Sequence, residues 1–579
     1  MIKNIICFFV TIAFVTKSSA QNTLELVKNG KSDYKIIIPP DANEIEKQSA
    51  VVFQDYINRI SGCLLPVFKQ NPLAKGKQII IGRSKLINSA SLQELGNDGF
   101  IMRIIDNSLI LTGGTRKGVL YGVYTFLEDY LGCRMYTSKV IYIPKNNSII
   151  LPATIDKKQT PTFKYRSTYF TDALNKDYCD FHKMNYFMED WGLWVHSFSV
   201  LVPKEKYFKT NPTYFALVNG QRTTDQLCLT NPAVVTTVTE NLRKLIKEKP
   251  GAKYWSVSQN DNDNFCQCNN CKKLNEEQGS FNGSVLSFVN NVAKYFPDKT
   301  ITTLAYRNTE TPPKTLRPLP NVLVMLCTAY DERRVPLREQ TNVSFYGNFK
   351  NWAAITKELF IWDYIVPFAH ALSPFPNYYT IQPNIQYFAS RNATQIFLNG
   401  IGDFHGEFSE LRCYLASRLM WNKDIDVKAT IEEFITGYYG KVGGAYISRY
   451  IAMLDKNARS KPVGVRSGGE PLDAINSYLS PENIDAYKVV FEDAIKVTSG
   501  TVYNNRIITE YLSVLYAELE INKALSTKDK KTMSSANRVN TELLNNFYKK
   551  MKQLNLIYLN ESWLQVDDYY KGYLLLLSK

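Results

Sequence analysis

Histidine is scarce in this chain of 579 residues, and several common catalytic motifs are missing from it. The only histidines are His182, His196, His370 and His405. Because the histidines are few and scattered, the sequence argues against a multi-histidine metal site and against a histidine-rich pH switch. The GxSxG and HExxH motifs are absent, and no expected strand is followed by GxGxxG. These absences argue against an α/β-type serine hydrolase, a zinc protease and a Rossmann dinucleotide-binding fold.

Long apolar runs are missing after residue 20. No later segment approaches the roughly 18 uninterrupted apolar residues of a membrane-spanning helix. Residues 1–20 combine Lys3, an apolar segment over 5–15 and the small residues 18–20, a pattern that predicts a signal peptide. No cysteine follows directly, so a lipid anchor there is not indicated. We therefore expect no membrane span and a protein secreted to the periplasm or cell surface of a bacterium.

The charge is basic but dispersed. Lysine and arginine total 69 against 54 acidic residues, a net charge of +15, and acids lie near the basic helical segments 243–249 and 528–531. A nucleic-acid surface would need a concentrated basic stripe with interleaved aromatic residues, so we expect no nucleic-acid partner. The hydrophobic content of 45% is that of a globular protein with more than one core.

Hydrophobic periodicity divides the chain into three expected domains after the signal peptide. Short apolar strands at 34–39 and 78–82 flank a helical pattern over 44–61, which predicts a small α/β domain over 21–155. Long helical patterns fill 456–579, an expected all-helical domain. Between them, over 156–455, strands alternate with helices, which predicts an α/β fold with a TIM (β/α)8 barrel. The eight candidate strands are 165–170, 184–188, 227–230, 254–258, 300–306, 322–327, 359–362 and 395–398.

Carboxylates, carboxamides and aromatic residues follow most of these expected strands. Catalytic groups of TIM barrels stand at the carboxyl ends of the strands, and this mixture of side chains suits a carbohydrate site. The alternative is that many of them are hydrogen-bonding or helix-capping residues of the barrel rim. The candidate substrate-binding residues are Trp191, His196, Gln259, Asn260, Asp263, Tyr306, Asp331, Trp362, Asp363 and Asn399.

Glu189 and Asp190 form the sharpest pair of acids. Two adjacent carboxylates after a strand can divide their roles, one giving a proton to the glycosidic oxygen and the other raising its partner's pKa or orienting the substrate. Apolar neighbours such as Phe187 and Trp191 favour partial enclosure, whereas the alternative is a solvated turn. Asp261, on a different strand end, is the third candidate catalytic residue.

Three cysteines, Cys266, Cys268 and Cys271, lie in a CxCxxC pattern. They can bind a structural zinc with a fourth ligand such as Cys228, or form one disulfide with a spare thiol. Either arrangement would shape the loop that carries Asp261 without touching substrate. We expect no catalytic metal and no other cofactor.

Several segments resemble the bacterial domain-of-unknown-function family 4838, which overlaps glycoside hydrolase family 163. The resemblance covers about residues 24–455, and its N-terminal part, GGTRKGVLYGVYTFLEDYLGCRMY, is similar to the small α/β domain of α-glucuronidases and β-hexosaminidases. The other segments are WSVSQNDNDNFCQCNNCKKLNEEQGSFNGSVLSFVNNVAKYFPDKTITTLAY, WGLWVHSFSVLVPKEKYF, LFIWDYIVPF and ELRCYLASRLMWN. Members of family 163 are endo-β-N-acetylglucosaminidases that act on complex N-glycans.

The resemblance implies that Glu189 is the catalytic acid after the second barrel strand. It also implies that the substrate's 2-acetamido group acts as nucleophile, held by Asp190 or by its competitor Asp261. At the eighth strand end, where many relatives carry an acid, this chain has Asn399, and the nearest acids are Asp403 and Glu407.

The expected function is that of a secreted glycoside hydrolase. We expect retaining, substrate-assisted cleavage of β-linked N-acetylglucosamine, with endo action on N-glycans. The alternatives are an exo-acting hexosaminidase or α-glucuronidase-like hydrolase and, from another class, a non-catalytic glycan-binding surface protein.

Overall fold

The computed structural model describes residues 23–72, 76–328, 332–341, 343–461, 464–528, 533–560 and 563–578. The expected signal peptide lies outside these residues. The described chain forms two compact units, the first reaching to Cys133 and including Ile143–Gln159, the second made of Arg134–Tyr142 and the residues from Thr160 onward. The domain boundaries expected from sequence at 155 and 455 stay predictions. Within the described residues, every helix is too short or too polar to cross a bilayer.

The first unit is a mixed sheet covered by helices. Its six strands lie in the order β10-β5-β6-β4-β2-β3, and β1 pairs separately with β9. Helix α1 begins with a capping box, in which the Asn43 side chain accepts from the Glu46 amide and the Glu46 carboxylate accepts from the Asn43 amide. It packs with α3 on the sheet. The bounds are β1 Thr23–Val27, β2 Lys35–Ile38, α1 Glu44–Ser61, β3 Val67–Lys69, β4 Gln78–Ile81, α2 Ser89–Gln93, β5 Phe100–Ile105, β6 Ser108–Gly113, α3 Gly118–Asp129, β9 Ile149–Pro152 and β10 Asp156–Gln159.

The second unit is built on a curled sheet of seven parallel strands, in the order β11-β19-β18-β17-β16-β15-β12. One buried cluster takes a side chain from every strand, among them Tyr165 of β11 and Trp191 of β12, the two edge strands. The indole N–H of Trp191 donates to the Tyr165 hydroxyl at 2.8 Å, so the two edges approach each other across this core. The strands are β11 Tyr165–Thr168, β12 Trp191–Leu193, β15 Tyr254–Ser256, β16 Thr300–Ala305, β17 Val322–Cys327, β18 Leu359–Tyr364 and β19 Ala393–Asn399.

Two of the eight expected strands are wrong. The segment 184–188 is not a strand, because its second half turns into the short helix α5 (Phe187–Asp190), and β12 follows that helix. Asn185 still lies beside β11, where its amide donates to the Arg166 carbonyl at 2.8 Å. Residues 227–230 overlap β14 (Gln221–Leu227), which pairs antiparallel with β13 (Phe215–Val218) outside the main sheet. The other six strands are confirmed, but a closed eight-stranded barrel is not.

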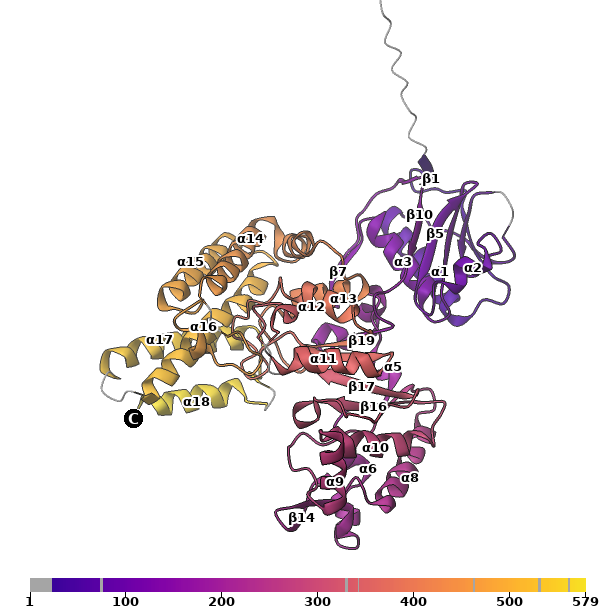
Figure 1. Cartoon of the computed structure of the whole chain (residues 1–579). Coiled ribbons are helices and arrows are strands. Elements are labelled where there is room, and N and C mark those ends of the chain that lie inside the picture. The colour runs from indigo at the N-terminus through magenta and orange to yellow at the C-terminus, as the bar shows by residue number, and fades with distance from the viewer. Residues whose placement is uncertain are drawn as a thin grey trace, which may run out of the picture. The chain divides into compact units, whose positions relative to one another are not determined.

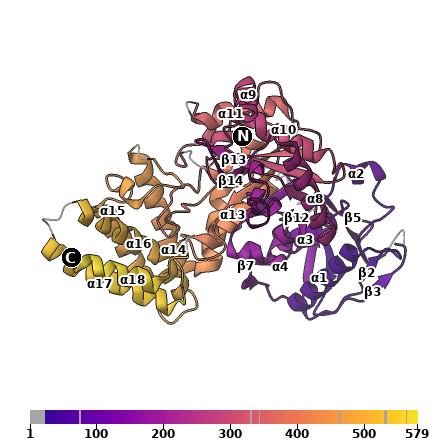
Figure 2. The same ribbon diagram turned by 90° about the horizontal axis from the view of Figure 1, so that it is seen from below.

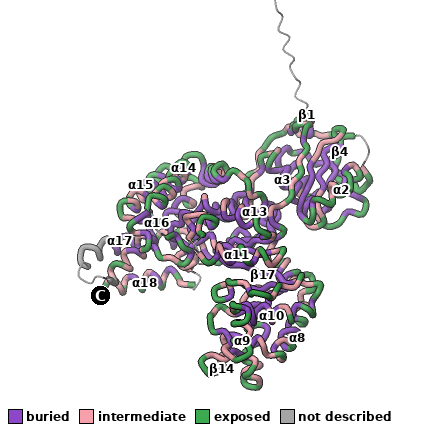
Figure 3. Tube along the Cα trace, viewed as in Figure 1, coloured by how far each residue is buried: buried purple, intermediate pink, exposed green. Residues whose placement is uncertain are grey.

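Helices connect the strands and then continue into a helical C-terminal region. Figure 1 shows the connecting helices α8, α10, α11, α12 and α13 beside the sheet, and Figure 2 shows α14 to α18 gathered together. These last helices pack in succession, and α13 is largely buried (Figure 3). The bounds are α8 Pro232–Glu248, α10 Asn282–Ala293, α11 Ser344–Ile355, α12 Ile381–Ala389, α13 Ser409–Trp421, α14 Val427–Ser460, α15 Pro481–Val497, α16 Asn504–Lys528, α17 Met533–Gln553 and α18 Val566–Leu577.

A small hairpin, β7 (Arg134–Thr137) with β8 (Val140–Tyr142), belongs to the second unit although its neighbours in sequence belong to the first. Arg134 forms an ion pair with Glu433 of α14 at 2.7 Å. The Tyr136 ring contacts the Phe434 ring, with 5.9 Å between the centroids. These contacts hold the hairpin against the helices that follow the sheet.

Candidate active site

A cavity of about 470 Å³ opens at the carboxyl ends of β11, β18 and β19. The Trp194 and Trp362 rings that line it are stacked on each other, with centroids 5.3 Å apart. Trp362 is buried and Trp194 is half-buried, so Trp194 is the more open ring of the pair. An aromatic ring that lines a cavity can pack against the apolar face of a sugar, and a few polar groups can fix its orientation. The lining residues are Thr168, Tyr169, Ala173, Leu174, Phe187, Trp194, Trp362, Phe397, Asn399, Ile401, Asp403 and Phe404.

A second cavity, of about 530 Å³, shares Asp403 and Phe404 with the first. It is lined by the β7–β8 turn, the segment after β11, the loop after β19 and residues 555–558. Three carboxylates line it, those of Asp172, Asp403 and Glu410. The aromatic cavity therefore continues into an acidic one, and Asp403 is the carboxylate common to both.

Asp403 lies in the loop after β19 and is exposed. Its Oδ1 atom accepts a hydrogen bond from the Tyr169 hydroxyl at 2.7 Å, and Tyr169 directly follows β11. The carboxylate is thus held by a neutral donor from the neighbouring strand, and this bond leaves its second oxygen able to accept from a substrate.

Asp172 is a buried carboxyl group after β11. The amide and hydroxyl of Ser138 both donate to its Oδ1 atom, at 2.7 and 2.6 Å. Burial raises the pKa of Asp172, and the nearby charge of Glu410 adds to that rise, while the Ser138 hydrogen bonds oppose it. A raised pKa favours the protonated form, which is the form that a general acid needs.

Glu410, His405 and Glu510 form a second polar group beside this cavity, with one ligand-type atom of each lying within 4.8 Å of the others. The Oε2 atom of Glu410 and the Nε2 atom of His405 are buried and have no hydrogen-bond partner among the described residues. Burial, with the charge of Glu410, raises the pKa of Glu510 well above its usual value. The raised pKa favours the protonated form of Glu510, which lessens the repulsion between the Glu410 and Glu510 carboxyl groups.

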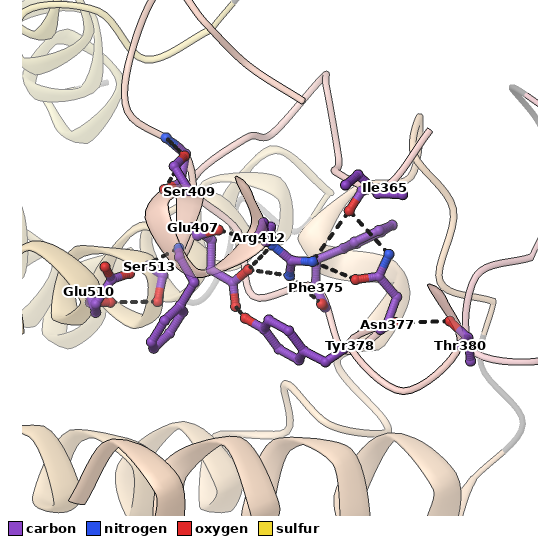
Figure 4. Close-up of polar contacts among 12 residues, drawn as sticks. Ile365, Phe375, Asn377, Tyr378, Thr380, Glu407, Ser409, Arg412, Glu510 and Ser513 are labelled. Carbon is purple, nitrogen blue, oxygen red and sulfur yellow. Dashed lines mark hydrogen bonds and ion pairs between the residues drawn. The ribbon is translucent and has the colours of Figure 1, made fainter. Parts of the chain in front are cut away.

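A buried polar network supports the loop that carries Asp403 (Figure 4). The Arg412 guanidinium forms an ion pair with Glu407 and donates to the Asn377 side chain at 2.5 Å. Tyr378 donates to the other Glu407 oxygen at 2.6 Å. Glu407 is 2% exposed and fully engaged, so it supports the loop and does not face either cavity.

The expected catalytic pair, Glu189 and Asp190, was predicted to follow a strand. In the structure the two residues precede one instead. They lie on α5, at the amino end of β12, and the Asp190 carbonyl accepts from the amide of Lys253, which precedes β15. Glu189 is exposed and pairs with Lys176 at 3.0 Å, and Asp190 accepts from the Asn185 side chain at 2.8 Å. Phe187 of the same short helix lines the aromatic cavity, but neither Glu189 nor Asp190 lines either cavity.

Trp191 also differs from its expected role. Its side chain is 3% exposed, in the core of the sheet, so neither face of the ring is open to a sugar. The neighbouring Trp194 takes the expected place in the aromatic cavity.

The expected residues around β15 and β16 form a separate group outside both cavities. His196 Nδ1 lies 2.9 Å from the Gln259 carbonyl, and the Gln259 side chain donates to Thr309 at 2.7 Å. Asn260 donates to the Asp225 carbonyl at 2.7 Å. These contacts match the alternative of rim hydrogen-bonding residues.

Of three further residues in this group, Asp261 and Asp263 are exposed and Tyr306 is half-buried. Asp261 and Asp263 face Arg307, which pairs with both. The Tyr306 ring lies 6.3 Å from the His196 ring, between centroids. The group is therefore a polar surface beside the cavities, with its acids already balanced by an arginine.

The remaining expected substrate-binding residues fall into two groups, those that line the aromatic cavity and those that do not. Trp362 and Asn399 line the aromatic cavity. Asp363 is buried instead, accepts from Arg333 at 2.8 Å and from Thr328 at 2.5 Å, and faces neither cavity. Burial raises the pKa of Asp363, and the Arg333 charge opposes the rise. Asp331 lies outside the described residues.

Sequence reasoning missed the roles of Tyr169, Phe187, Phe397, Asp403 and Phe404 in the cavity. Tyr169 directly follows β11, and Phe397 lies within the expected strand 395–398, so both carried a local signal. Asp403 comes four positions after the end of β19, where only the folded loop brings it to Tyr169.

A family model described as "Domain of unknown function (DUF4838)" matches residues 135–452, more than half of the chain. The chain belongs to the DUF4838 family. A second model, "Glycosyl hydrolase family 67 N-terminus", matches residues 49–126. The curated proteins contain no match to this DUF4838 member.

Solved structures similar to this DUF4838 member include glycoside hydrolases. A family GH115 4-O-methyl-α-glucuronidase, BtGH115A, with specificity for decorated arabinogalactans, has a TM-score of 0.52 and 12% identity over 96% of this chain and 76% of its own. CpGH84B has a TM-score of 0.46 and 12% sequence identity, over 95% of this chain and 97% of its own. A GH138 enzyme targeting pectin rhamnogalacturonan II has a TM-score of 0.41 and 10% sequence identity, over 94% of this chain and 79% of its own. At these identities the likeness to BtGH115A describes the fold.

Proposed function

We propose that this protein is a glycoside hydrolase whose active site is formed by the two joined cavities. The observation that carries the proposal is the meeting of stacked Trp194 and Trp362 with the Asp403 carboxylate at the carboxyl ends of parallel strands. Catalytic groups of (β/α) barrels occupy that end of the sheet. The Glycosyl hydrolase family 67 N-terminal match is consistent with the same chemistry.

The proposed catalytic unit is a variant of the (β/α)8 barrel. In it, the segment 184–186 and β12 share one strand position, since Asn185 bonds to β11 and β12 pairs with β15. This arrangement would close the sheet around its aromatic core.

Asp172 and Asp403 are the proposed catalytic carboxyl groups. Most glycosidases use two, one as acid and one as nucleophile, base or orienting group. The raised pKa of Asp172 suits the acid, and exposed Asp403, held by Tyr169, suits the second role. The proposed substrate is β-linked N-acetylglucosamine in an N-glycan, cleaved within the glycan and with retention. In that reaction Asp403 would hold the acetamido group that acts as nucleophile.

The test is incubation of the purified protein with an N-glycoprotein, followed by mass spectrometry of the released glycans. Release of an oligosaccharide supports endo action, and release of single sugars supports an exo-acting hexosaminidase. Proton NMR of the first product gives the stereochemistry: a β-anomer supports retention, and an α-anomer contradicts the substrate-assisted route.

An α-glucuronidase-like activity is the second candidate, favoured by the match of residues 49–126. Release of glucuronic acid from a glucuronylated oligosaccharide would support it. If glycans bind but neither substrate is cleaved, the aromatic cavity serves a non-catalytic glycan-binding protein instead. In each case we propose export by the segment 1–20 to the periplasm or cell surface.

A further inference from the structure

Four cysteines gather at one point of the second unit. The sulfur atoms of Cys228, Cys266, Cys268 and Cys271 all lie within 4.8 Å of one another. Cys228 directly follows β14, Cys266 and Cys268 lie in the loop after β15, and Cys271 lies in the first turn of α9 (Asn269–Gln278). The fold therefore supplies a fourth thiol from a distant segment to the local CxCxxC pattern.

The spacing of the sulfurs fits a tetrahedral metal site. The Sγ atoms of Cys228 and Cys268 are 3.7 Å apart. Four sulfurs at the Zn–S distance of about 2.3 Å form a tetrahedron with edges of about 3.8 Å. Cys228, Cys266, Cys268 and Cys271 form no disulfide bond, so the four thiols are available as ligands.

Neighbouring groups are arranged to stabilise negative sulfur atoms. The Leu217 amide donates to Cys266 Sγ at 3.3 Å, and the Thr230 hydroxyl lies 3.2 Å from Cys271 Sγ. Cys268 is the N-cap of α9, so it and Cys271 stand at the positive end of the helix dipole.

Apolar side chains shield the cluster from water. Ala216, Cys228, Cys266 and Cys271 are buried together, and Leu217 and Val218 of β13 pack against them. Three of the four sulfurs are thus buried and Cys268 is half-buried, and the N–H donor to Cys266 is an outer-shell contact of the kind that metal sites use.

We propose that Cys228, Cys266, Cys268 and Cys271 bind one structural zinc ion. On binding, each thiol loses its proton, so that Zn²⁺ and four thiols give a tetrathiolate of charge −2 and four released protons. Four protein ligands complete the tetrahedron and leave no position for water, which makes the site structural and not catalytic. The ion fastens the β13–β14 hairpin to the loop after β15 and to α9.

The loop fixed in this way carries Asp261 and Asp263. The hairpin also reaches it through the Gln226 side chain, which donates to the Asn260 and Asn262 carbonyls at 2.8 and 3.0 Å. Loss of the metal is therefore expected to loosen this loop, while the aromatic cavity stays intact.

The first test measures metal in the full-length protein as purified. Elemental analysis is expected to give one zinc per chain, and titration with a mercurial reagent should release it after four thiols have reacted. A metal-free native protein with freely reactive cluster thiols would overturn the proposal. Finding iron in place of zinc would also overturn it. So would an intact mass four hydrogen atoms below that of the fully reduced chain, because that mass indicates two disulfides.

Variants test the ligands one by one. Cys271→Ser and Cys228→Ser are expected to weaken zinc binding at least about 10-fold. The matched control is Cys63→Ser, which removes a buried free thiol of the first unit and should keep one zinc. Loss of zinc from the control, or its full retention in both cluster variants, contradicts the assignment.

A second variant keeps the test decisive if the serine variants do not fold. Cys228→His replaces one thiolate with imidazole, another good zinc ligand. After substitution with Co²⁺, the wild type should show the visible absorption of a tetrahedral tetrathiolate, and Cys228→His should shift it. An unshifted spectrum would exclude Cys228 as a ligand.

Discussion

Asp403 differs from the carboxylates of Glu407 and Asp363 because a neutral hydroxyl holds it. Glu407 and Asp363 are buried and paired with arginines, and removing one partner of such a pair leaves an uncompensated charge. Asp403 is exposed at the junction of the two cavities. At the scale of single residues, it is therefore the carboxylate best placed to meet a substrate.

We expect Asp403→Asn to lower the rate of glycan release by about 10²- to 10⁴-fold, because a positioned acid or base contributes that much. The fold should be unchanged, since the amide can still accept the Tyr169 hydrogen bond. Glu189→Gln is the control, because the Glu189 side chain is exposed and lines neither cavity. Rates of product release measured for both variants check this, and an inactive Glu189→Gln beside an active Asp403→Asn would reverse the assignment.

At the scale of elements, α14 is interrupted by a kink. Gly440 has φ of 75° and ψ of 161° inside the helix, and a Cβ atom there would lie 2.7 Å from the Tyr503 ring. The kink thus needs a residue that tolerates positive φ and takes up no space. Gly347 in α11 is the opposite case, because a Cβ atom there would meet nothing within 4 Å.

Gly440→Ala is expected to lower the free energy of unfolding by roughly 2 kcal/mol or more, from backbone strain and the clash with Tyr503. Gly347→Ala should raise it by about 0.5–1 kcal/mol, because alanine is the better helix former. Urea unfolding followed by tryptophan fluorescence measures both. Equal midpoints for the two variants would show that the kink is not a constraint.

The sheet strands that were predictable are those with continuous apolar runs, such as VLVMLC in β17. The segment 184–188 has a less regular pattern, and short runs do not distinguish a strand from a helix. Its structure is decided by distant partners, β11 on one side and the Trp191 core on the other. The hairpin at β13–β14 did carry a local signal, Asn219-Gly220 with positive φ at both residues, typical of a two-residue turn.

The candidate site was predictable where a side chain lies at the end of a correctly placed strand. Trp362 and Asn399 lie towards the ends of β18 and β19 and line the cavity. Glu189 and Asp190 were expected after a strand, but they lie on the short helix α5 that precedes β12. Asp403 could not be found in this way, because the loop that carries it is shaped by the Glu407–Arg412 network.

At the scale of the whole second unit, Glu510 links the helical region to the loop after β19. From α16 it accepts the Phe408 amide at 2.9 Å and the Tyr439 hydroxyl of α14 at 2.8 Å. Burial raises the pKa of this carboxyl group well above its usual value. A group whose pKa is higher in the folded state stabilises the fold fully only below its unfolded pKa, and this contribution is lost as pH rises through the folded pKa.

Glu510→Gln should therefore be more stable than the wild type at neutral and alkaline pH, and the difference should vanish near pH 4. The amide oxygen can accept the Phe408 hydrogen bond, and the NH₂ group can donate to the Tyr439 oxygen once that hydroxyl turns its own proton away, as a protonated glutamic acid can. Thermal midpoints measured from about pH 4 to 9 check the trend. Glu248→Gln, at an exposed position in α8, is the control and should leave the thermal midpoint unchanged at both low and high pH. A wild type that is the more stable protein at pH 8 would contradict the expectation.

During synthesis, the β7–β8 hairpin emerges long before the helices that it contacts in the folded protein. It leaves the ribosome before Ile143–Gln159 complete the first unit, yet its partners Tyr414, Glu433 and Phe434 come much later in the chain. At roughly 5–20 residues per second, the hairpin waits on the order of tens of seconds for them. During that time, the nascent chain holds an unpartnered strand pair tethered at both ends to the first unit. A truncation that removes everything up to Gln159 would take away the hairpin together with that unit, and with it the turn that lines the acidic cavity.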